Sequence, residues 1–104
     1  MTHNEFNKIL RQRLTFIKQT LATKAQEYST TSDRLHNFRV AARIDDETPV
    51  QAAWGMFKKH LVSIIDLKDG TQVPTEALIN EKFGDAIIYL IIMEAILRET
   101  LNED

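Results

Sequence analysis

Hydrophobic residues recur at intervals of three and four along most of the chain, and this spacing predicts four α-helices. The first helix is expected at about residues 4–28, and the short second helix at about residues 34–43, capped by Ser32 or Asp33. One face of the first helix carries Phe6, Ile9, Leu10, Leu14, Ile17, Leu21, Ala25 and Tyr28. The inner face of the second helix carries Leu35, Phe38 and Ala42.

The third helix is expected at about residues 49–67. Thr48 and Gln51 form a Thr-x-x-Gln pair that can cap its start reciprocally, and Pro49 suits its first turn. Gly70 can take the left-handed conformation that ends it. Its apolar face is Val50, Ala53, Trp54, Phe57, Leu61, Ile64 and Ile65.

The last helix is expected at about residues 75–102, opened by Pro74 and apolar on nearly every side after Asp85. With no alternating strand pattern, the sequence predicts one all-α domain over residues 1–104, a helical bundle of three long helices and one short helix. So small a domain covers only part of such an apolar helix, which predicts a homo-oligomer.

Composition narrows the class of protein. The net charge of −2 argues against sequence-independent nucleic-acid binding, although a small basic patch stays open. The absence of cysteine removes disulfides, thiolate nucleophiles and zinc–thiolate sites. No apolar run approaches the roughly 20 residues of a membrane span, and the N-terminus carries charges where a signal peptide is apolar. We therefore expect a cytoplasmic protein.

Two short segments carry the first candidate ligand-binding residues. Lys24 and Glu27 share a face near Tyr28, and their spacing fits an ordinary surface ion pair as well as a site. His36 and Asn37 lie beside apolar neighbours, where a histidine is usually structural and an asparagine amide can cap a helix or contact a base edge.

The segment FKKHLVSIID in the third helix carries Lys58, Lys59 and His60. The lysines can form a solvated edge, with His60 as a satisfied core histidine near the apolar face. In the functional interpretation, a lysine and the histidine face an anionic ligand. The spacing slightly favours the structural interpretation.

Glu81 and Asp85 lie one turn apart in the last helix, where two carboxylates repel each other unless a cation or a proton intervenes. They suit Mg²⁺ with water and phosphate oxygens, or they point to solvent with Lys82 as a partner. Gly84 costs about 1 kcal/mol in a helix interior, which suggests that another backbone or a ligand comes close. Tyr89 can send its hydroxyl into the same region.

Three segments together, KAQEY…DRLHNF, ETPVQAAWGMFKKHLVSIID and INEKFGDAIIYLIIMEAILRE, resemble a set of small, mostly phage-encoded proteins of uncharacterised role. That set is distantly similar to the MazG-like all-α nucleoside triphosphate pyrophosphatases and to phage nucleotide-modification-associated domains. The resemblance implies a nucleotide-directed protein, in its enzymatic form an Mg²⁺-dependent pyrophosphohydrolase.

The same resemblance assigns roles to residues of this chain. It implies that Glu27, Glu81 and Asp85 bind magnesium and act in catalysis, while lysines contact phosphates, namely Lys24, Lys58 or Lys59. The MazG-like enzymes usually carry a cluster of glutamates on the first helix, where this chain offers only Glu27, and they space the later pair by three residues rather than four.

These departures leave two alternatives open. The chain can bind and sequester a nucleotide or cyclic nucleotide without turnover, as a counter-defence module does. It can also be an interaction protein that acts through its apolar last helix.

Overall fold

The computed structural model describes residues 1–27 and 32–102, without the side chain of Glu27. The described ranges form four helices and contain no strand. The helices are α1 (His3–Glu27), α2 (His36–Ile44), α3 (Pro49–Lys68) and α4 (Glu76–Leu101). The predicted all-α class is confirmed.

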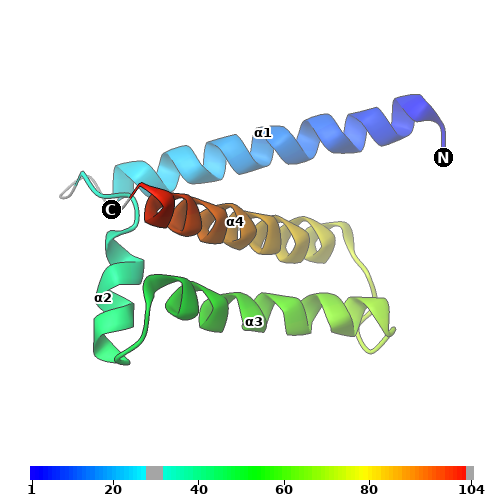
Figure 1. Cartoon of the computed structure of the whole chain (residues 1–104). Coiled ribbons are helices and arrows are strands. Elements are labelled where there is room, and N and C mark those ends of the chain that lie inside the picture. Colours follow the sequence, from blue (N-terminus) through cyan, green and yellow to red (C-terminus); the bar gives the residue numbers. More distant parts are fainter. Residues whose placement is uncertain (28–31, 103–104) are drawn as a thin grey trace.

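Helix α4 lies between α1 and α3, and α2 crosses one end of the molecule beside the start of α3 (Figure 1). The core forms where α3 packs on α4, from the buried residues Ala53, Phe57, Ala86, Met93 and Ile96. Leu35, at the N-cap of α2, and Phe38, within α2, pack against this core, as the apolar spacing predicts.

The helix-boundary signals around α3 act as predicted. The Thr48 N–H donates to Gln51 Oε1 at 2.9 Å, and the Gln51 N–H donates to Thr48 Oγ1 at 3.3 Å, so the capping box is confirmed. Gly70 takes the left-handed conformation after the end of α3, with φ 77°. These contacts satisfy backbone groups that a helix end would otherwise leave unpaired.

The start of α2 differs from the prediction, because Leu35 and neither Ser32 nor Asp33 is its N-cap. Asp33 uses one carboxylate oxygen to accept the Leu35 N–H at 3.0 Å and the other to pair with Arg39 Nε at 2.6 Å. The chain turns around this carboxylate, and α2 begins two residues later than expected.

Much of the predicted apolar face of α1 is exposed. Ile17 is buried, whereas Phe6, Ile9, Leu10 and Leu14 are 47–59% exposed. Arg13 already contacts the first turns of α4, so the part of α1 before it extends past the beginning of α4 (Figure 1).

Two residues assigned to the inner face of α3, Trp54 and Ile65, are likewise 47% and 41% exposed, because they lie beside the contact with α4 rather than in it. Within residues 1–27 and 32–102, no helix has the length and apolar character needed to cross a membrane.

Candidate functional site

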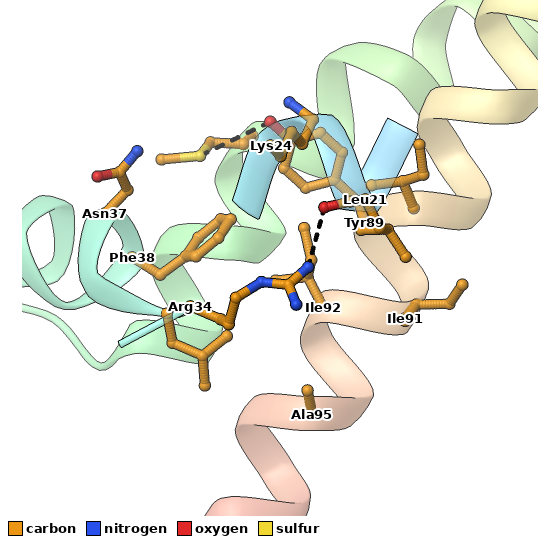
Figure 2. A pocket seen from close by; sticks show the side chains of 12 residues that line it. Leu21, Lys24, Arg34, Asn37, Phe38, Tyr89, Ile91, Ile92 and Ala95 are labelled. Atoms are coloured by element: carbon orange, nitrogen blue, oxygen red, sulfur yellow. Dashed lines mark hydrogen bonds between the residues drawn. The ribbon is translucent and has the colours of Figure 1, made fainter. Parts of the chain in front are cut away.

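A cavity of about 450 Å³ lies where the end of α1 meets α2, α3 and α4, and we call it the α1–α4 cavity. This volume falls within the roughly 300–1,000 Å³ of small-molecule pockets. Its walls are mainly apolar (Figure 2). The lining residues are Leu21, Lys24, Arg34, Leu35, Asn37, Phe38, Met56, Ile88, Tyr89, Ile91, Ile92 and Ala95.

Two basic side chains from different parts of the chain line this apolar cavity. Lys24 comes from the last turn of α1, and Arg34 precedes α2. Arg34 Nη2 donates to the Leu21 carbonyl at 3.0 Å, which ties the guanidinium to the end of α1 (Figure 2). None of the described lining residues is acidic, so the cavity favours an anionic ligand.

Aromatic contacts hold one wall of the cavity in place. The ring of Tyr89 stacks on His60 with centroids 4.9 Å apart and meets the edge of Phe38 at 6.4 Å. Behind the wall, His60 Nδ1 lies 3.7 Å from Asp85 Oδ2. Stacking and edge-to-face contacts of this kind restrain rings in one orientation, so Tyr89 presents a fixed surface to the cavity.

The predicted ligand-binding residues divide between the cavity and the surface. Lys24, Asn37 and Tyr89 line the cavity, and His60 supports Tyr89 from behind. His36, Lys58 and Lys59 are not among the lining residues. They are exposed, and Tyr28 lies outside the described residues.

The predicted acidic residues do not form one described cluster. Glu81 is exposed and lies 3.3 Å from Lys82 Nζ, whereas Asp85 contacts His60. The side chain of Glu27 lies outside the described atoms. In the described part of the chain, no three histidine, aspartate or glutamate side chains are arranged to hold a metal ion. Because the side chain of Glu27 is outside the described atoms, the magnesium set of Glu27, Glu81 and Asp85 stays a prediction.

Gly84 allows a close approach, as its position in α4 suggests, but the neighbour is α1 rather than a ligand. A Cβ atom at this position would lie 2.6 Å from Phe16 Cε1 and 2.7 Å from Arg13 Nη1. Arg13 Nη1 also donates to the Asn80 carbonyl at 3.0 Å. The glycine is thus explained by packing.

Arg34 is the cavity residue that sequence reasoning missed. It opens the segment RLHNF, in which His36 and Asn37 were singled out instead. The sequence held one signal for this role: Arg34 is a second basic residue close in sequence to Lys24, on the other side of the connection from α1 to α2.

An ionic network fixes α2 against α4 at this end of the molecule. Arg39 pairs with Asp33 at 2.6 Å and with a Glu99 carboxylate oxygen at 2.7 Å. The hydrogen bond from Arg39, followed by that from the Leu35 N–H, holds the pKa of Asp33 below its ordinary value of 3.8. The same two carboxylates raise the pKa of Arg39, which stays charged.

No protein family, curated protein or solved structure matches the chain. The similarity to phage proteins and MazG-like enzymes stays a prediction.

Proposed function

We propose that the chain binds a nucleotide or a cyclic nucleotide in the α1–α4 cavity without hydrolysing it. The observation that carries this proposal is the combination of Lys24 and Arg34 with apolar and aromatic walls in one cavity. A ligand that matches it needs an anionic group and a flat, largely apolar ring.

The two cations suit phosphate oxygens in different ways. Lys24 carries an ammonium group on a flexible side chain. Arg34 carries a planar guanidinium with five N–H donors, and its Nη2 donates to the Leu21 carbonyl. Charge-assisted hydrogen bonds of this kind are about twice as strong as neutral ones. A phosphate group would therefore lie at the end of the cavity that α1 and Arg34 form.

The remaining walls suit a nucleobase. Phe38 and Tyr89 supply aromatic surfaces, and Ile88, Ile92 and Ala95 supply apolar ones. Asn37 carries both a donor and an acceptor in its amide, which can contact a base edge. The cavity thus offers apolar contact area together with a few polar groups that can orient a ligand.

The hydrolytic alternative needs magnesium held by Glu27, Glu81 and Asp85. Glu81 lies eight residues before Tyr89, about 12 Å along the helix axis from this cavity wall. Asp85 is engaged with His60. Binding without turnover requires neither a metal ion nor a reorganised acidic cluster, so it is the function we favour.

Calorimetry on the full chain tests the proposal with a panel of nucleoside mono- and triphosphates and cyclic nucleotides. The matching nucleosides and inorganic phosphate serve as probes for each half of the ligand. We expect at least one nucleotide to bind, and both halves alone to bind at least tenfold more weakly. A ligand at 100 times its Kd adds about 2.7 kcal/mol to the free energy of unfolding. A thermal melt would then shift by roughly 10 °C or more.

Variants locate the binding site. Lys24→Gln and Arg34→Gln are expected to weaken binding by about ten- to a hundredfold, in line with 1.5–3 kcal/mol for a charged hydrogen bond. Lys59→Gln, the same change on the exposed surface of α3, is expected to leave it unchanged. Absence of binding across the panel, or equal effects of all three variants, would contradict the proposal.

A pyrophosphate assay with magnesium separates the two functions. The proposal predicts that bound nucleotide is recovered intact. Turnover that is lost in Glu81→Gln would instead support the hydrolase.

A further inference from the structure

Five large apolar residues form a straight exposed stripe along α4. They are Ile79, Phe83, Leu90, Leu97 and Leu101, with exposures of 40–78%. Their successive spacings of four, seven, seven and four residues keep them within an arc of roughly 40° around the helix. An isolated exposed leucine is ordinary, but a continuous line of five is not.

This stripe lies on the side of α4 away from the α1–α4 cavity. Leu90 is two residues from Ile88 and two from Ile92, which both line the cavity, so it points roughly half a turn away from each. Helix α1 contacts α4 at Gly84 and at the Asn80 and Ile79 carbonyls, which accept from Arg13 at 3.0 and 3.5 Å. The contact at Ile79 is to its backbone, and the residue stays 42% exposed. The side chains of the stripe therefore face neither the cavity nor the Arg13 contact.

Helix α3 extends the same surface. Trp54 lies two residues before the cavity residue Met56, hence on the opposite side of α3, and Ile65 falls on nearly the same line as Trp54. Both are exposed, at 47% and 41%. We call the seven residues together the α3–α4 face.

We propose that the α3–α4 face is the surface through which two copies of this chain associate. Its seven residues are 40–78% exposed. Together they expose on the order of 600 Å² per copy, the upper end of the range for the largest apolar patch of a typical monomer. A standard stable interface buries about 800 Å² per partner, including its polar rim. The face is thus large enough to form the centre of such an interface.

The charges around the face suit a second copy better than an anionic membrane. The exposed charged residues three or four positions from members of the face include both signs in equal number, namely Lys58, Lys68 and Arg98 with Asp69, Glu76 and Glu94. A face that binds an anionic membrane carries an excess of basic residues. A face with similar numbers of basic and acidic residues can instead pack against the same face of a second copy without net repulsion. Equal patches on both partners are what a two-fold dimer requires.

The spacing of the stripe also points to another long helix as its partner. Phe83, Leu90 and Leu97 repeat every seven residues, the interval that keeps a seam between two packed helices. Helix α4 has 26 residues and is about 39 Å long. Two α4 helices can therefore pack along most of their length.

Sedimentation equilibrium of the full chain between 1 and 200 µM tests the proposal. We expect the wild-type chain to form a dimer. Leu90→Glu is expected to raise the dimer dissociation constant at least a hundredfold. It should retain the helical content, because Leu90 is half exposed in the single chain. Leu97→Glu repeats the test seven residues further along should Leu90→Glu fail to fold. The matched control is Leu10→Glu, the same change at a 47% exposed leucine of α1, which is expected to leave the dimer intact.

A monomeric wild-type chain at 200 µM would overturn the proposal. So would a dimer that survives both α4 variants, or one that Leu10→Glu dissociates instead.

Discussion

Gly84 lies where α1 packs against α4, and its missing side chain leaves room for the ring of Phe16 and the guanidinium of Arg13. Gly55 is also inside a helix, but a Cβ atom there would have no neighbour within 4 Å. The two glycines share a helical backbone and differ only in their surroundings, so they form a matched pair.

Gly84→Ala is expected to destabilise the fold by about 1 kcal/mol, because overpacking costs roughly 1–3 kcal/mol and outweighs the gain in helix propensity. Gly55→Ala is expected to stabilise it by about 0.5–1 kcal/mol. Urea denaturation of both variants measures these changes. In a background that carries both Phe16→Ala and Arg13→Ala, Gly84→Ala should become neutral or stabilising, and an unchanged penalty there would refute the packing explanation.

The sequence could identify Gly84 as unusual but could not say what approaches it. A glycine inside a helix indicates that a side chain would not fit there, but it does not indicate what lies close by. Phe16 and Arg13 lie more than sixty residues away in the chain, so no local pattern connects them with Gly84. For the same reason Arg34 was missed. Its role depends on the meeting of all four helices at the cavity, which local spacing does not encode.

At the scale of elements, Arg39 joins the turn before α2 to the last turns of α4 through Asp33 and Glu99. The helices themselves follow from local signals, since apolar periodicity, the Thr48 capping box and Gly70 act over a few residues. The start of α2 was misjudged because the carboxylate of Asp33 pairs with a residue of α2 instead of capping it.

This ion pair makes stability depend on pH in a defined direction. The pKa of Asp33 is lower in the folded chain than its ordinary value of 3.8, so the unfolded chain takes up the proton first as pH falls. The contribution of Asp33 is present above about pH 4 and is lost as pH falls through the folded pKa.

Asp33→Asn is therefore expected to lower the free energy of unfolding at pH 7 and to make a much smaller difference at pH 2.5. Urea denaturation at both pH values measures the two differences. Each is expected to be modest, because the pair is more than one-third exposed and solvent screens it. If the difference in the free energy of unfolding between the wild type and Asp33→Asn grew toward low pH, it would contradict the lowered pKa of Asp33.

At the scale of the whole molecule, the layer of α1, α4 and α3 has two unlike sides. One side holds the cationic, aromatic α1–α4 cavity, and the other carries the apolar α3–α4 face. The sequence predicted that α4 is too apolar for one small domain to cover. It could not show which side would stay exposed, because that depends on where α1 and α3 pack.

The cavity and the apolar face use different residues, and this separation makes ligand binding and self-association independently testable. Leu90→Glu is expected to leave nucleotide affinity unchanged, and Arg34→Gln is expected to leave the dimer intact.

Methyl NMR of the three methionines is the sharpest test of nucleotide binding in the α1–α4 cavity, because Met56 lines the cavity, Met1 is 83% exposed and Met93 lies in the core. On titration with the tightest-binding nucleotide, we expect the Met56 methyl resonance to shift most and to saturate with the calorimetric Kd. A Met56 resonance that stays unmoved while the nucleotide is bound would contradict it.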